Sequence, residues 1–188
     1  MLEHLVWTVP CCVRQLRRLQ LTILEGGTSF DARALGSLSA LEQLELCRWD
    51  TVKFAQGQPL LPSLTKLKIG QAGGRVEIDA AFPSLQRLVL LDCGDLWLNG
   101  AQLHLSRLST MVLENVSGTA HIKFAQVPAL EHLAVLGVGG WAEAGFASLS
   151  HLSALTIACN NEATLRVINS ILGAAPTSIH FLQDFTRG

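Results

Sequence analysis

The sequence predicts an α/β solenoid, a stack of short repeats whose strands form a parallel β-sheet on the concave side, with an irregular convex side. Two observations predict it. A leucine triplet of the form L-x-x-L-x-L recurs seven times, at steps of 21 to 25 residues, and another apolar residue stands three places before each triplet. Seven units with four matching apolar columns indicate a repeat that covers nearly the whole chain.

The triplets are Leu16-Leu19-Leu21, Leu41-Leu44-Leu46, Leu64-Leu67-Ile69, Leu85-Leu88-Leu90, Leu108-Met111-Leu113, Leu130-Leu133-Val135 and Leu152-Leu155-Ile157, preceded by Val13, Leu38, Leu61, Phe82, Leu105, Val127 and Leu149. Partial units flank them at Leu2-Leu5-Trp7 and Ile179-Phe181. The last two apolar positions of a triplet are two residues apart, so they share one face of a short strand. One unit cannot bury this face alone, and we therefore expect the units to stack.

This pattern resembles that of leucine-rich repeat proteins. The segment FPSLQRLVLLDCGDL, residues 82–96, is similar to the irregular repeats of plant and algal F-box proteins and of plant nucleotide-binding immune receptors. The family column that usually holds Asn or Cys matches only at Cys93 and Asn160. We therefore expect most turns to satisfy their backbone groups without an Asn ladder.

The segments that return from one triplet to the next vary. Most are short and alternating, as in VKFA (52–55), VEIDA (76–80), LWLNG (96–100) and HIKFA (121–125), which favours extended chain. Thr28-Ser29-Phe30-Asp31 offers an N-cap before ARALGSL, so a helix is predicted in the longest unit. Asn161 is placed to cap a second helix over EATLRVINSIL, near the C-terminal end.

The composition fits one folded domain over residues 1–188, with 49% hydrophobic and 15% charged residues. The net charge of −1, without clustered Lys and Arg, argues against nucleic acid as a partner, and no apolar run is long enough to span a membrane. The odd number of cysteines, five, and the lack of a C-x-x-C pair argue against a disulfide framework and indicate a reducing, cytoplasmic setting. Because the chain begins almost inside a repeat, we expect a fragment of a longer protein or a truncated gene product.

No pattern in the chain predicts catalysis. The six histidines have no metal-ligand spacing, and every unit is accounted for as repeat. We therefore expect no catalytic residues, no metal and no cofactor. Two tryptophans, Trp49 and Trp141, fall in turns beside the strands, where they could anchor a partner or fill irregular space between units.

The concave face is the candidate site, because its residues alternate with the buried leucines. The predicted partner-binding residues are Arg18, Gln43, Glu45, Lys66, Lys68, Arg87, Val89, Leu91, Val112, Glu114, His132 and Leu136. The first half of this face is polar and mostly basic, and the second half is apolar. An exposed apolar patch of this kind indicates a binding site. The alternatives are that a flanking segment or a second copy covers the patch, or that β-propensity alone selected these residues.

These observations favour a non-enzymatic module that binds another protein by apolar burial, with the basic residues steering an acidic rim of the partner. The family resemblance implies two settings, substrate recognition in an F-box ubiquitin ligase or sensing in an immune receptor. An orphan array that only folds is a third possibility. The sequence leaves the partner's identity and the oligomeric state open.

Overall fold

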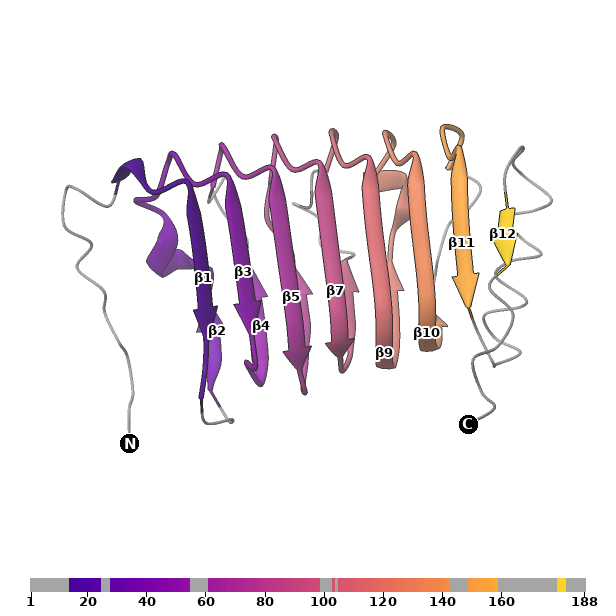
Figure 1. Ribbon diagram of the computed structural model, residues 1–188, viewed down its shortest axis with the longest axis horizontal. Helices are drawn as coiled ribbons and strands as arrows, with labels where there is room; N and C mark the ends of the chain where they lie inside the picture. Colours follow the sequence, from indigo (N-terminus) through magenta and orange to yellow (C-terminus); the bar gives the residue numbers. More distant parts are fainter. Residues whose placement is uncertain are drawn as a thin grey trace.

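The computed structural model describes residues 14–24, 28–54, 61–98, 103, 105–142, 149–158 and 179–181. Eight of its strands lie side by side and form a parallel sheet, which we call the triplet sheet (Figure 1). In spatial order they are β1 (Arg18–Thr22), β3 (Gln43–Cys47), β5 (Lys66–Ala72), β7 (Arg87–Cys93), β9 (Thr110–Ile122), β10 (His132–Ala142), β11 (Ala154–Ala158) and β12 (Ile179–Phe181). The predicted solenoid with a parallel sheet along one side is confirmed.

The register of the triplet sheet follows the leucine columns of the sequence. Leu19 pairs with Leu44, which pairs with Leu67, and the column continues without a slip to Ile179 in β12. The next apolar column runs in the same way from Leu21 to Phe181. A slip by one residue would turn every leucine outward, so burial of the leucines determines this register.

The return segments form a second parallel sheet behind the first. Its strands are β2 (Ser29–Asp31), β4 (Thr51–Phe54), β6 (Val76–Ile78) and β8 (Leu96–Leu98), and β8 pairs with the end of β9 at Ala120–Ile122. The prediction of extended return segments is therefore confirmed over residues 52–54, 76–78 and 96–98. In the fourth segment it holds only for residues 121–122, because Phe124–Gln126 forms a short 3₁₀ helix. Strands β9 and β10 are long enough to take part in both sheets.

The core lies between the two sheets. Leu44, Leu67 and Leu88 face inward from the triplet sheet, and Val52, Val76 and Leu96 face inward from the second; each is at most 2% exposed. The aromatic rings of Phe54 and Phe82 meet edge to face at 5.3 Å. At the β1 end the core is less covered, because Leu16, Leu19 and Leu21 are only half-buried.

A hydrogen-bonded turn precedes each strand of the triplet sheet from β3 to β11. The apolar residue three places before the triplet accepts a bond from the first triplet N–H, as in Leu64 to Leu61 at 3.1 Å and Leu85 to Phe82 at 3.2 Å. Proline stands second in this turn at Pro62, Pro83 and Pro128, where its restricted φ fits the turn. These turns explain why the fourth apolar column is kept at a constant distance from the triplet.

At the other end of the strands, five successive turns contain one residue in the left-handed region. These residues are Arg48, Gln71, Asp92, Asn115 and Gly137, with φ between 50° and 74°. Backbone bonds link neighbouring turns, including Arg48 N to Gly70 O at 3.0 Å and Gly94 N to Ala72 O at 2.8 Å. The turns therefore satisfy their backbone groups largely by bonding to one another, as expected from the missing Asn ladder.

The predicted helix after Asp31 is only a four-residue 3₁₀ segment, Ala32–Leu35. Two constraints leave no room for more. Ser29–Asp31 pairs with β4 in the second sheet, and Leu38 must enter the turn that accepts the N–H of Leu41 at 3.0 Å. The second helical segment that the structure describes fully, Phe124–Gln126, is also 3₁₀. The helix expected over EATLRVINSIL lies outside the described residues.

Candidate binding face on the triplet sheet

The outward-facing side chains of the triplet sheet form three straight rows, because the strands are parallel and in register. We call this surface the triplet face. The first row contains Arg18, Gln43, Lys66, Arg87, Thr110, His132 and Ala154. The middle row contains Gln20, Glu45, Lys68, Val89, Val112, Ala134 and Thr156. The last row contains Thr22, Cys47, Gly70, Leu91, Glu114, Leu136 and Ala158.

All twelve residues that the sequence analysis proposed for binding lie in these rows. The structure therefore brings them onto one surface, while their role in binding stays a prediction. Two rows change character along the stack. The first row begins with cations and continues with Thr110 and His132, and the middle row changes from charged to aliphatic between Lys68 and Val89.

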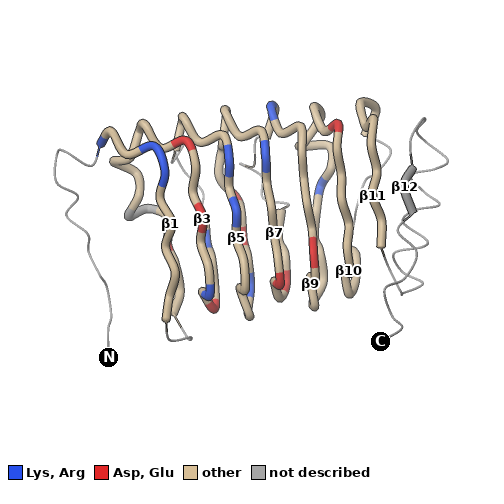
Figure 2. The backbone as a smooth tube through the Cα atoms, viewed as in Figure 1, with Lys and Arg blue, Asp and Glu red and all other residues tan. Residues whose placement is uncertain are grey.

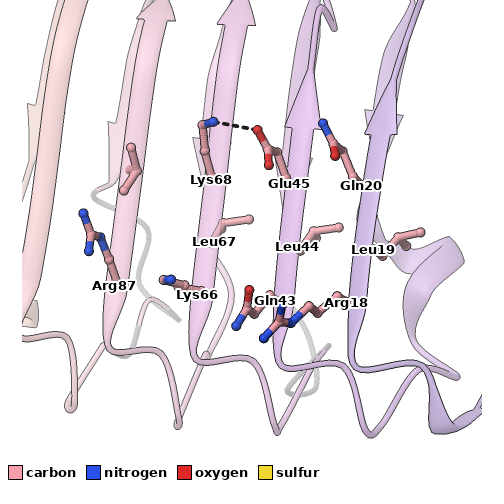
Figure 3. Close-up of a pocket in the computed structure, with 11 residues that line it drawn as sticks. Arg18, Leu19, Gln20, Gln43, Leu44, Glu45, Lys66, Leu67, Lys68 and Arg87 are labelled. Carbon is pink, nitrogen blue, oxygen red and sulfur yellow. Dashed lines mark hydrogen bonds and ion pairs between the residues drawn. The ribbon is translucent and has the colours of Figure 1, made fainter.

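The basic half of the face surrounds a pocket of about 590 Å³ that extends over β1, β3, β5 and β7 (Figure 3). Arg18, Lys66 and Arg87 lie along its first row with Gln43 between the first two, and all three cationic side chains are exposed. Figure 2 shows Lys and Arg positions, in blue, at the upper ends of β1, β5 and β7. Among the described residues, none of the three forms an ion pair.

The middle row of the pocket contains an internal ion pair. Lys68 Nζ donates to Glu45 Oε1 at 2.6 Å, across neighbouring strands (Figure 3). The hydrogen bond from the ammonium to Glu45 raises the pKa of Lys68 above its ordinary value. The pocket lining contains four cations and one carboxylate, a net charge of +3, whereas the whole chain has a net charge of −1. The pocket is therefore strongly positive relative to the rest of the molecule.

The apolar half of the face is present but less exposed than its sequence indicated. Val89, Leu91, Val112 and Leu136 are all half-buried, and Glu114 separates Leu91 from Leu136 in the last row. Neighbouring strands lie about 4.8 Å apart, so each side chain is partly covered by those beside it. The apolar half of the triplet face is therefore a shallow band of partly exposed side chains beside the basic pocket.

The two tryptophans considered as anchors do not lie on this face. Trp49 packs against Phe30, with ring centroids 4.9 Å apart, and both Trp49 and Trp141 pack against the core. This packing is the space-filling role that the sequence analysis left open as an alternative. The second sheet also carries a stack that sequence reasoning missed: Trp97 lies against His121 at 3.8 Å and under the Arg75 guanidinium at 4.2 Å. The stack could have been predicted from the sequence, because Trp97 and His121 occupy matching positions in neighbouring return segments.

Other chemistry is sparse in the described part of the chain. The described residues contain no group of three or more His, Cys, Asp or Glu side chains that could hold a metal ion. Cys93 is 1% exposed and its thiol donates to the carbonyl of Leu91 at 3.4 Å. No helix within the described ranges is long and apolar enough to cross a membrane. Compared with known proteins, the chain matches no family model and no curated protein.

Proposed function

We propose that the chain is a non-enzymatic binding module of the leucine-rich-repeat type, which holds another protein on its triplet face. The observation that carries the proposal is the arrangement of this face, with exposed cations around a pocket next to a partly exposed apolar band. Protein interfaces combine an apolar centre with a polar rim in this way. The charged half orients the partner during the encounter, and the apolar half supplies burial.

A parallel sheet suits this role because its hydrogen-bonded backbone holds the outer rows at a fixed spacing. Each strand of the triplet sheet from β3 to β11 is bonded on both sides, and the inner leucines of the central strands are packed in the core. The backbone under the outer rows is therefore preorganised, and little backbone entropy is lost when a partner binds. A reducing compartment such as the cytoplasm fits the two described cysteines, Cys47 and Cys93, which are both free thiols.

Introduction of charge into the apolar band tests the proposal. The variant Leu91→Arg, Leu136→Arg places two cations in the band, and we expect at least a tenfold loss of partner captured from native extract. The matched control, Ser29→Arg, Ala125→Arg, adds the same charge at exposed positions outside the triplet face. Circular dichroism and urea unfolding establish that both variants are folded.

The outcomes separate a binding module from an array that only folds. A partner that is held by the wild-type chain and the control but lost by the band variant supports the proposal. A chain that captures nothing specific, or whose partner survives in both variants, contradicts it.

A further inference from the structure

We infer that the partner presents an extended acidic segment whose carboxylates alternate along its chain and lie on the first row of the triplet face, crossing from β1 to β7. This inference rests on the proposed function and names the chemistry of the partner. It is carried by the charge of the pocket, by the position of the unpaired cations and by the spacing of the strands.

The charges that are available to a partner lie in one row. Glu45 already neutralises Lys68 in the middle row, whereas Arg18, Lys66 and Arg87 form no ion pair among the described residues. Arginine binds carboxylates with two parallel hydrogen bonds, so Arg18 and Arg87 suit the two ends of an acidic segment. An anionic partner therefore forms its most favourable electrostatic contacts along the first row.

The spacing of the row matches an extended peptide that runs across the strands. Adjacent strands are about 4.8 Å apart, which places Gln43, Lys66 and Arg87 about 5, 10 and 14 Å from Arg18. An extended chain advances about 3.3 Å per residue, so acidic residues at alternate positions lie about 7 and 13 Å beyond the first. The first carboxylate then meets Arg18, the second lies between Gln43 and Lys66, and the third meets Arg87.

A nucleic acid fits the same surface less well. Single strands are held by aromatic side chains on which the bases stack, together with a basic groove. The three rows contain no Phe, Trp or Tyr from β1 to β11, and the band that follows the pocket is aliphatic. An acidic peptide can use this band for apolar residues that follow its carboxylates.

The test uses fluorescence anisotropy with three labelled probes. The first is a nonapeptide of three Glu and six Ser, with Glu at alternate positions. The second has the same composition with its three Glu contiguous, so that the middle carboxylate points away from the row. The third is a short thymidine strand. We expect the alternating peptide to bind at least threefold more tightly than the block peptide, and more tightly than the thymidine strand.

Paired variants locate the binding. Lys66→Gln, Arg87→Gln removes two cations from the row, and we expect about tenfold weaker binding of the alternating peptide. Arg48→Gln, Lys123→Gln removes the same charge from exposed positions outside the row and should leave binding unchanged. Glutamine is tolerated at position 48, because Gln71 has the same left-handed conformation in the next turn.

Any of four results would overturn the inference. The two peptides bind equally, the two variants have equal effects, the thymidine strand binds more tightly than the alternating peptide, or the alternating peptide does not bind at about 1 mM and low salt. The proposed function fails separately. If a captured partner is lost with Leu91→Arg, Leu136→Arg but kept with Lys66→Gln, Arg87→Gln, the binding face stands and the acidic segment is wrong.

Discussion

Among single residues, Glu45 supplies the one carboxylate in the lining of the basic pocket. Its carboxylate pairs with Lys68 at 2.6 Å, and both side chains stay substantially exposed, at 31% and 44%. Exposed pairs of this kind contribute little to stability, so the main physical effect of Glu45 is that it lowers the positive charge of the pocket.

We predict that Glu45→Gln lowers the free energy of unfolding by no more than about 0.5 kcal/mol near neutral pH. The difference should be present below pH 10.5, the ordinary pKa of lysine, and should disappear as the pH rises through the raised pKa of Lys68. Urea unfolding of both chains at pH 7 and at a series of pH values above 10.5 measures it. A difference that does not shrink while Lys68, followed by its own titration, loses its proton would show that Glu45 acts through something other than the charge of Lys68.

Cys93 gives a second prediction for a single residue. Burial raises the pKa of its thiol to about 11, from 9.0. A pKa that is two units higher corresponds to about 100-fold less thiolate at pH 8, and the thiolate is the species that reacts. In a variant that keeps only this cysteine, we expect a disulfide reagent to modify the folded chain at least 100-fold more slowly than the urea-unfolded chain. Comparable rates in the two states would contradict the burial of Cys93.

At the scale of elements, the turns between the two sheets require close backbone approach. A Cβ added to Gly94 would collide with the carbonyl oxygens of Gly73 and Gly74 in the neighbouring turn. Glycine is needed at position 94 for this reason, rather than for an unusual φ.

We predict that Gly94→Ala lowers the free energy of unfolding by about 2 kcal/mol or more, because two turns must separate to admit the methyl group. The control is Gly73→Ala, where the nearest atom to the added Cβ, Asp50 Oδ1, is 4.0 Å away. That substitution should be neutral or slightly stabilising, since it reduces the freedom of the unfolded chain. Urea unfolding distinguishes the two; similar effects would mean that the turns do not pack as the structure shows.

The sheets could be predicted from the sequence because their cause is local and repeated. Alternation of apolar and polar residues in each triplet determines which side chains face inward, so the three outer rows follow from the repeat alignment. The left-handed turn position was harder to find, because Arg48 and Gln71 are not residues that favour it, although Asp92, Asn115 and Gly137 are. The helix after Asp31 was predicted wrongly in length, because pairing of Ser29–Asp31 with β4 overrides a local capping signal.

The candidate site could be predicted as a set of residues but not as an electrostatic surface. The repeat alignment places Glu45 beside Lys68, yet only the side-chain geometry shows that they pair and leave the first row as the basic one. Likewise, the aliphatic character of Val89 and Leu136 is visible in the sequence, whereas their partial burial depends on the neighbouring strands.

At the scale of the whole molecule, each repeat contacts mainly its two neighbours, so stability should vary along the stack. Leu88 is fully buried in the middle, and Leu21 occupies the equivalent inner face in the half-covered strand β1. The same substitution at the two places compares the centre with this end.

We predict that Leu88→Ala lowers the free energy of unfolding by about 2 to 5 kcal/mol and that Leu21→Ala lowers it by about half as much or less. The methyl groups lost from Leu88 leave a cavity between two packed layers, whereas solvent already reaches Leu21. Urea unfolding followed by circular dichroism measures both changes. An equal loss at the two sites would mean that the β1 end is packed as tightly as the centre.

The continuous register of the leucine columns has a consequence for how such a chain can evolve. Because the leucine columns pair in the same way from each triplet strand to the next, duplication of one unit of 21 to 25 residues would insert a triplet strand in the same register. Each duplication would lengthen the three outer rows by one residue and about 4.8 Å. The length of acidic segment that the surface can accommodate is therefore open to selection in discrete steps, independently of the fold that supports it.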